Sequence, residues 1–501
     1  MSMPWSCDTY VAQTDVTTKG RLIFGKNSDR PAGEVQPLRF VSARDKGDRL
    51  DLSYVSVSDE SAYAHLGAAP FWCWGYEFGI NEHNVVIGNE AQFTRSWAED
   101  VSRAKDGNPP TGGIIGMELV RLGLERGSSA RKAVDVMTAL LEQHGQWGSG
   151  TFGKDPAEGS YDNSYLIADR KCAWVLETSG REWVAREVTS GIYSISNEPS
   201  IRSKYDRRSD GLLETARKRG WITADISFDY AATHVDPMTP LQVSHMRQRR
   251  SQQLLQEACA KGGVDLPSAK AVLRDHFEGT FLDGPYFNAA RSDFLTLCMH
   301  EHEAGFTWGN TAGSMIVEMG KDADDLTVIW WTPLSPCIGA YIPIFLESAE
   351  IPQSLQIPVS VDGVRPPEDF EQPAFDSASY WWRFQNLLDA AKGDASGSRF
   401  SERQASIRGR FDRLEIGWNK EVEDLRRSWK LAGDEQRTHL ALELRGLTSR
   451  AVEEVDAEVD SFLLEYAPKG RSQSLDPRWT KREFPPGYSD LDRARRAGHP
   501  V

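Results

Sequence analysis

Four residues near the start of the chain have side chains suited to nucleophilic chemistry. Cys7 opens the apolar stretch CDTYVA, and Lys26, Asn27 and Asp29 lie together in GKNSD. Lys26 offers the positive neighbour that stabilises a thiolate, and Asp29 offers an anchor for an amine. If the six residues before Cys7 are removed, one residue carries both a thiol and a free α-amine. That amine has an ordinary pKa of about 8, which suits a general base.

A hairpin must bring these residues together. The stretches TYVAQTD and RLIFGKN have strand character, and VTTKG between them is typical of a turn. With the turn centred on Thr17, paired residue numbers sum to roughly 34, which places Cys7 opposite the end of GKNSD. A second interpretation stays open here. Cys7 is then a small, half-buried apolar residue, and GKNSDRP is a solvated loop rich in turn formers.

Composition excludes several classes of function. The formal net charge of −15, with no basic block, argues against a nucleic-acid partner. We find no apolar run long enough to span a bilayer and no pattern typical of a secretory signal. The six cysteines are scattered, without a CxxC pair, so neither a disulfide scaffold nor a zinc motif is expected. These observations favour a cytoplasmic protein that acts on a small molecule, with no membrane partner.

The chain divides into regions of different character. Strand-like segments and helix pairs up to about residue 350 favour an α+β layered domain. A proline-rich connector follows over 351–376. Residues 377–468 have the pattern of long amphipathic helices broken at Gly433, which predicts a packed hairpin or a contact in a homo-oligomer. The tail over 469–501 has an irregular pattern.

Several motifs in consistent order resemble one enzyme family. CDTYVA, IFGKNSDRPAGEVQ, GINEHNVVIGNEA, DNSYLIADRKCAWVLETSGREWVA, YSISNEPSI, CMHE and TAGSM run over roughly residues 7–345. This set is similar to the secernins and the dipeptidase A peptidases, which are cysteine-type N-terminal nucleophile (Ntn) hydrolases. The resemblance implies a four-layer αββα sandwich over 7–350, followed here by a C-terminal helical extension. It also implies autocatalytic removal of residues 1–6 as a propeptide.

The resemblance assigns roles to individual residues. Cys7 matches the nucleophile and Asp29 the aspartate of the related acylases, whereas Lys26 stands where they have arginine. Asn197 matches a donor to the oxyanion, and Asn89 is expected to supply a side chain or a backbone N–H there. An arginine of HMRQRRSQ matches the last catalytic position; Arg250 is the first choice, with Arg247 close behind. The same segment could hold a substrate carboxylate, with Arg250 or Arg247 as the substrate-binding residue.

Other candidates carry simpler interpretations. Trp72 and Trp74 are expected in the core or pocket wall, with a minor possibility of an aromatic platform for substrate. Glu77, Glu82 or Glu90 are candidates to meet a substrate ammonium. The spacing of His300 and His302 puts both on one face of a strand, but without further ligands we expect no metal and no cofactor. The remaining cysteines are expected in the core: Cys73, Cys172, Cys259, Cys298 and Cys337.

The sequence therefore predicts an amidohydrolase that cleaves a dipeptide or another small amide through a thioester acyl-enzyme. One alternative is a specialised non-peptide amidase related to penicillin V acylase and bile salt hydrolase. Another is a secernin-like regulatory or scaffolding protein with a weak site, which binds through its charged helices.

Overall fold

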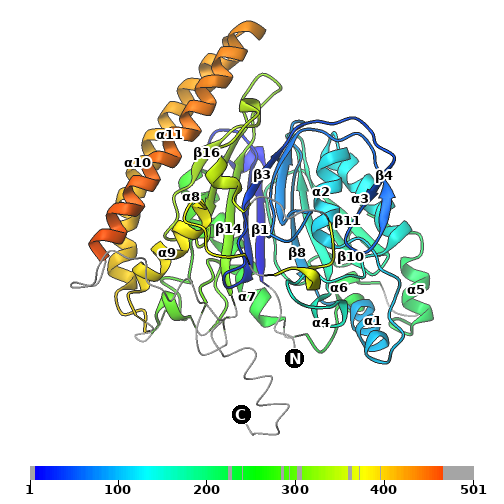
Figure 1. Ribbon diagram of the computed structural model, residues 1–501. Helices are drawn as coiled ribbons and strands as arrows, with labels where there is room; N and C mark the ends of the chain where they lie inside the picture. The colour runs from blue at the N-terminus through cyan, green and yellow to red at the C-terminus, as the bar shows by residue number, and fades with distance from the viewer. Residues whose placement is uncertain are drawn as a thin grey trace.

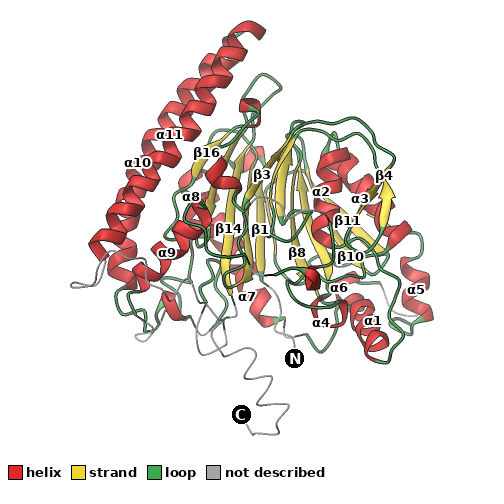
Figure 2. Cartoon of the chain, in the orientation of Figure 1, coloured by secondary structure: helices red, strands yellow, loops and turns green. Residues whose placement is uncertain are grey.

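Two antiparallel sheets face each other across the centre of the molecule (Figures 1 and 2). This computed structural model describes residues 6–223, 228–239, 241–283, 287–292, 294–301, 307, 309–358, 364–371, 373–394 and 396–466. The first sheet has the strand order β12 (Ile192–Ile195), β1 (Cys7–Ala12), β2 (Ile23–Pro31), β14 (Gly309–Glu318), β15 (Val328–Pro333), β16 (Ile342–Ile344). The second has the order β13 (Arg207–Arg208), β11 (Glu182–Val188), β10 (Ala173–Ser179), β9 (Asp162–Ala168), β8 (Val86–Gln92), β7 (Phe78–Asn81), β6 (His65–Ala68), β3 (Leu38–Val41).

Helices cover the outer face of each sheet. On the first sheet lie α7 (Gln242–Ala260), α8 (Leu266–Leu273), α9 (Tyr380–Lys392) and α11 (Asp434–Tyr466). On the second lie α2 (Gly116–Arg126) and α3 (Ala130–His144). The layers therefore follow the order helix, sheet, sheet, helix, and the predicted αββα sandwich is confirmed (Figure 1). Further elements at the periphery are β4 (Arg49–Asp51), β5 (Ser56–Ser58), α1 (Arg95–Lys105), α4 (Pro156–Gly159), α5 (Leu212–Lys218) and α6 (Tyr230–His234).

The predicted N-terminal hairpin forms as strands β1 and β2. Cys7 pairs with Ser28 and Thr9 with Lys26, so the paired numbers sum to 35, one more than the sequence predicted. β2 also pairs with β14 along its whole length. Strand β2 is thus central in the first sheet, and its residues Lys26 to Asp29 are buried rather than part of a solvated loop.

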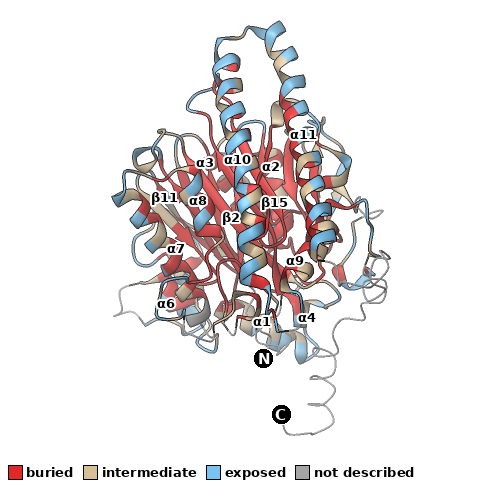
Figure 3. Ribbon diagram, turned by 90° about the vertical axis from the view of Figure 1, so that its left-hand side faces the viewer, coloured by how far each residue is buried: buried red, intermediate tan, exposed pale blue. Residues whose placement is uncertain are grey.

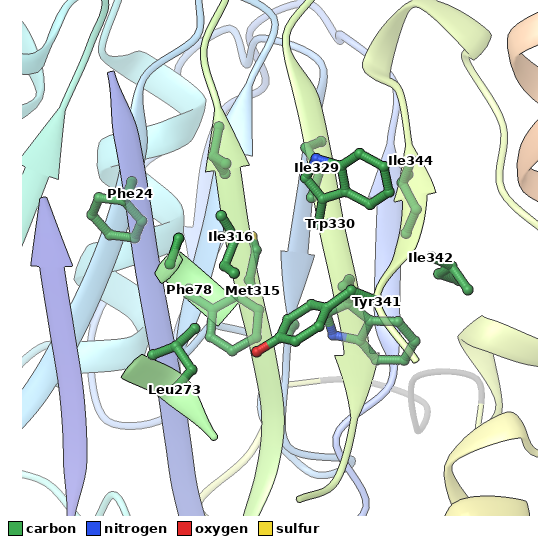
Figure 4. Close-up of a cluster of buried hydrophobic side chains, with 14 of the residues drawn as sticks. Phe24, Phe78, Leu273, Met315, Ile316, Ile329, Trp330, Tyr341, Ile342 and Ile344 are labelled. Atoms are coloured by element: carbon green, nitrogen blue, oxygen red, sulfur yellow. The ribbon is translucent and has the colours of Figure 1, made fainter. Parts of the chain in front are cut away.

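The core beside this hairpin is apolar on both sides of the first sheet. Phe24, Met315 and Ile316 come from β2 and β14, and Trp330 and Tyr341 lie by β15 and β16 (Figure 4). All five are at most 1 % exposed, so burial of these large side chains fixes the sheet on which the N-terminal residues lie.

The C-terminal helical region packs as the sequence indicates. α10 (Phe400–Leu431) and α11 form an antiparallel pair on either side of Gly433, and part of this hairpin projects beyond the sheets (Figure 3). One face of α10 buries Ile407, Phe411, Trp418 and Val422 in the same core as the first sheet. The packed hairpin is confirmed, whereas an oligomer contact stays a prediction. Among the described residues, none of the helices has the length and apolar character needed to cross a membrane.

Candidate active site

The Cys7 thiol lies in the space between the two sheets. Side chains alternate along a strand, so Cys7 and Thr9 share one face of β1 and Asp8 and Tyr10 share the other. Thr9 bonds to Glu90 of β8 in the opposite sheet, whereas Asp8 pairs with Arg247 of α7. The thiol therefore faces the second sheet, while helix α7 approaches the main chain of the same residue.

The main chain on both sides of the Cys7 α-carbon is held by hydrogen bonds. The Cys7 N–H donates to Asn197 Oδ1 at 2.9 Å, and Arg247 donates to the Cys7 carbonyl at 3.1 Å. Arg247 also donates to Asn197 Oδ1 at 2.9 Å, and Asn197 Nδ2 donates to the Ala91 carbonyl at 2.8 Å. The nitrogen that would become the α-amine of a mature Cys7 is thus fixed against an oxygen acceptor.

Asp29 contacts both residues of the Ser6–Cys7 bond. Its backbone N–H donates to Cys7 Sγ at 3.4 Å, and its carboxylate accepts from the Ser6 hydroxyl at 2.7 Å. The second carboxylate oxygen accepts from Thr311 of β14 at 2.6 Å. Burial, and then the charge of Asp8, raise the pKa of Asp29 to about 7. The bond that the sequence predicts to be cleaved therefore lies beside a carboxyl group that is half protonated near neutral pH.

The thiol itself is not ionised by its surroundings. Burial raises the pKa of Cys7 to about 12, although the Lys26 ammonium lowers it. Lys26 is fully buried, donates to the Asn89 carbonyl and to Glu90, and lies 3.3 Å from the Glu90 carboxylate. Burial lowers the pKa of Lys26, but the nearby Cys7 and Glu90 groups raise it by more than burial lowers it. Lys26 therefore stays protonated. Chemistry at this thiol needs a base, and Lys26 cannot be that base.

The arginine at Cys7 is Arg247, which corrects the choice of Arg250 as the catalytic arginine. Arg250 lies one helical turn further along α7 and donates to Asp275 at 2.9 and 2.7 Å, and to the Glu278 carbonyl. Arg247 is fully buried and pairs with Asp8 at 2.5 Å. Burying Asp8 without this partner would be costly, because an unpaired interior charge is strongly disfavoured.

The two asparagines differ from what was expected. The Asn89 backbone N–H donates to the Glu77 carbonyl, and its side chain lies by Asn163, so neither is directed at Cys7. The expectation that Asn89 donates to an oxyanion is therefore corrected: its carbonyl instead holds Lys26. Asn197 does reach Cys7, but with its amide oxygen. Its expected donation to an oxyanion stays a prediction.

The expected substrate-binding residues also differ in whether the structure places them near Cys7. Glu77 lies near Cys7, whose pKa it raises, and pairs with Arg30 at 3.0 Å. Trp72 is 3 % exposed and donates its ring N–H to Glu34. Trp74 packs under Arg121 of α2 on the outer side of the second sheet, 3.9 Å from the guanidinium, so its assignment to the substrate pocket was wrong.

Three residues of the site were not among the residues singled out from the sequence. Asp8 was overlooked, although a carboxylate inside a buried strand requires a counter-charge and points to an arginine. Ser6 and Thr311 approach Asp29 from a chain end and from a distant strand. Met1 to Trp5, the rest of the predicted propeptide, and the tail over 469–501 lie outside the described residues. Within the described ranges, the side chains that could hold a metal gather in another cluster, which does not include Cys7: His276, Cys298, His300 and Cys337.

Comparison with known proteins finds a family match over the N-terminal part of the chain. Residues 6–216 match the family described as peptidase family C69. A dipeptidase of Bifidobacterium longum (strain NCC 2705) is 26 % identical over 207 residues, which cover 38 % of this chain and 36 % of the relative. The matched part thus spans about a third of that relative's length. The predicted resemblance is confirmed over residues 6–216; it was expected to extend to about residue 345.

The solved structures found by comparison are only distantly similar. A mutant of conjugated bile acid hydrolase from Clostridium perfringens has 12 % identity and a TM-score of 0.38, covering 65 % of this chain and 89 % of its own. The Caenorhabditis elegans ortholog of N-acylethanolamine-hydrolyzing acid amidase has 12 % identity and a TM-score of 0.30, covering 62 % and 92 %. The fold assignment therefore rests on the layers and strand order described above.

Proposed function

We propose, from the match of residues 6–216 to peptidase family C69, that the protein is an N-terminal cysteine amidohydrolase of the dipeptidase type. One observation carries the proposal. The Cys7 thiol accepts from the Asp29 N–H while the Cys7 nitrogen donates to Asn197, so nucleophile and prospective amine are both positioned on one residue.

Maturation begins at the Ser6–Cys7 peptide bond. The Cys7 sulfur attacks the Ser6 carbonyl carbon, the C–N bond breaks, and the proton lost by the thiol passes to the departing nitrogen. Water then hydrolyses the thioester, which releases residues 1–6 with a new carboxylate and leaves Cys7 with a free amine. Asp29 contacts the Ser6 hydroxyl and the Cys7 sulfur through different groups, so it positions both partners of this step.

Turnover uses the same sulfur on a substrate amide. A thiol with a pKa near 12 needs a neighbouring base, and the new α-amine has an ordinary pKa of about 8. The amine takes the thiol proton as sulfur attacks the carbonyl and gives it to the leaving nitrogen when the amide bond breaks. Water, deprotonated by the same amine, hydrolyses the acyl-enzyme. Lys26 remains a fixed positive charge beside the sulfur.

The surroundings of the thiol favour a charged substrate over an apolar one. Glu77 and Glu90 lie close enough to raise the pKa of Cys7, and both are buried beside cations. Carboxylates there suit the ammonium of a free dipeptide. The argument for an apolar substrate is weakened, because Trp72 donates a hydrogen bond to Glu34 and Trp74 lies outside the site. The Bifidobacterium relative is itself named as a dipeptidase, which agrees with this choice.

A substrate panel tests the proposal. We would compare kcat/KM for free dipeptides with their N-acetylated and C-amidated forms and with simple N-acyl amides. Free dipeptides should be the best substrates, because blocking a terminus removes a charge that the charged groups around Cys7 can attract. Equal or faster hydrolysis of doubly blocked compounds would favour the specialised amidase. No hydrolysis by correctly processed protein would favour the regulatory alternative.

A further inference from the structure

A second buried centre lies at one end of the first sheet, outside the residues used above. His276, Cys298, His300 and Cys337 each offer one ligand atom, and these four atoms all lie within 4.8 Å of one another. All four side chains are at most 1 % exposed. They come from three separate segments: the loop after α8, the segment before β14, and the loop between β15 and β16.

Three distances within the cluster, all measured from His300 Nε2, are close to the edges of a tetrahedron around one ion. His276 Nε2 lies 3.0 Å from His300 Nε2, and Cys337 Sγ and Cys298 Sγ lie 3.2 and 3.7 Å from the same nitrogen. Zinc bonds of about 2.3 Å to sulfur and about 2.0–2.1 Å to nitrogen give tetrahedral edges of roughly 3.3–3.8 Å. The three measured distances lie within about 0.5 Å of these edges, so small side-chain movements would bring the four atoms to bonding distance of one ion.

The histidine orientations support the same conclusion independently. His276 Nδ1 lies 2.8 Å from the Glu278 carboxylate, and Glu278 also accepts from the His276 backbone N–H. A carboxylate on one ring nitrogen fixes the proton there and leaves Nε2 as a free lone pair, the arrangement usual behind metal-bound histidine. His300 also directs Nε2 at the cluster, and its Nδ1 has no partner among the described groups.

We propose that His276, Cys298, His300 and Cys337 form a structural zinc site with two sulfur and two nitrogen ligands. This site goes beyond the proposed hydrolase and does not depend on it. Two thiolates with two imidazoles select zinc over oxygen-preferring cations. Four protein ligands leave no open position, so the ion joins chain segments rather than binding substrate. This proposal replaces the expectation that no metal is bound. His302, which the sequence analysis considered together with His300, lies outside the described residues.

The site holds the segment that supports Asp29. Met299, between two ligands, accepts from the Thr311 N–H at 3.0 Å and donates to the Thr311 hydroxyl at 2.9 Å. The same hydroxyl donates to Asp29 at 2.6 Å. A bound ion would thus fix a chain of hydrogen bonds that runs through Met299 and Thr311 to the Asp29 carboxyl group, beside the Ser6–Cys7 bond.

The first test is metal analysis of the full-length protein, purified without a histidine tag. Mass spectrometry of the elements should find about one zinc per chain. Protein loaded with cobalt in place of zinc should show thiolate-to-cobalt charge transfer and the visible bands of tetrahedral cobalt. Protein that neither carries zinc nor takes up cobalt overturns the proposal, whether Cys298 and Cys337 prove to be free thiols or a disulfide.

Substitutions then assign the ligands. Cys298→Ser and Cys337→Ser should each lose the metal and the charge-transfer band, whereas Cys73→Ser, at an equally buried thiol outside the cluster, should keep both. Zinc retained by both ligand variants contradicts the assignment. If those variants do not fold, titration of the wild-type protein with a thiol-specific mercurial decides. Zinc must leave in step with two thiols, and zinc that stays bound after they have reacted excludes the site.

Discussion

The molecule holds two buried centres built around cysteine, and their surroundings differ. Cys7 sits at the start of a strand, with its sulfur beside an ammonium and a backbone N–H and its nitrogen against an amide oxygen. The sulfur atoms of Cys298 and Cys337 instead lie beside two imidazoles, and the four ligand atoms gather within 4.8 Å of one another. In the first centre a single sulfur is left to react. In the second centre, the two sulfur and two nitrogen ligand atoms lie close to one another.

This difference shows that the partners of a buried thiol decide its chemistry. Lys26 next to Cys7 stays charged and accepts no proton, so reaction depends on the amine that cleavage creates. At the proposed zinc site two ring nitrogens would complete the ligand set, so the sulfurs would bind a metal rather than attack a substrate. Variants that change one centre and spare the other test the distinction.

The largest expected effect comes from Cys7→Ala. Removal of the sulfur should lower hydrolysis by about 10⁴-fold or more, since no other group can form the acyl-enzyme. The thermal midpoint should move by only a few degrees, because little volume is lost. Cys337→Ser should instead lower the thermal midpoint strongly, because it removes a metal ligand. Calorimetry and a turnover assay separate the two, and substantial activity in Cys7→Ala would contradict the role of Cys7.

The next effect distinguishes two arginines on one helix. Arg247→Met leaves Asp8 buried without a counter-charge, which should cost about 3–5 kcal/mol of unfolding free energy. In protein that still folds, kcat should fall about 10²-fold, because Asn197 and the Cys7 main chain lose their support. Arg250→Met is the comparison: it removes hydrogen bonds to Asp275 and Glu278 but none to Cys7, so it should lower kcat far less than Arg247→Met does. Equal loss of kcat in both variants would restore Arg250 to the site.

A smaller effect is expected at the carboxylate behind His276. Glu278→Gln should weaken zinc binding about 10- to 100-fold, as is usual when a partner of a ligating histidine is changed. Competition with a chromogenic chelator measures this. Glu257→Gln, at a carboxylate on α7, is the control and should bind zinc as the wild type does. An unchanged affinity in Glu278→Gln would mean that the carboxylate only caps the loop.

The last effect is a pH dependence of stability that belongs to neither centre. Burial raises the pKa of Glu118 to about 7, from an ordinary value near 4.5. Between these values the unfolded chain loses its proton while the folded chain keeps it, so stability falls as pH rises, by at most about 3 kcal/mol. Urea titrations from pH 4 to 8 should show this slope reduced by one proton in Glu118→Gln. An unchanged slope would show that Glu118 ionises normally.

The sequence predicted the first centre far better than the second. Cys7 and the Lys26–Asp29 segment belong to one hairpin, so turn spacing and strand alternation were enough to place them together. Their order also carried the family resemblance. The pairing of Asp8 with Arg247 was harder to predict, because the rotation of α7 relative to β1 decides whether Arg247 or Arg250 points at the sheet. Only the packed helix settles that choice.

The second centre had no local pattern to reveal it. Its ligands are spread from His276 to Cys337, and only Cys298 and His300 are close in sequence. Long-range sheet pairing brings the three segments together, and no spacing rule anticipates such convergence. Trp74 failed for a related reason: the aromatic stretch predicted burial, but the sequence did not say on which side of the second sheet Trp74 would lie.

The intact mass of the purified wild-type protein tests the central claim most directly. The account predicts a mature chain that begins at Cys7, having lost residues 1–6, and predicts that Cys7→Ala keeps those residues. N-terminal sequencing of the same samples assigns the cleaved bond. Wild-type protein that retains residues 1–6 and still hydrolyses amides would contradict the account, because its Cys7 nitrogen would be a peptide N–H and could not serve as the base.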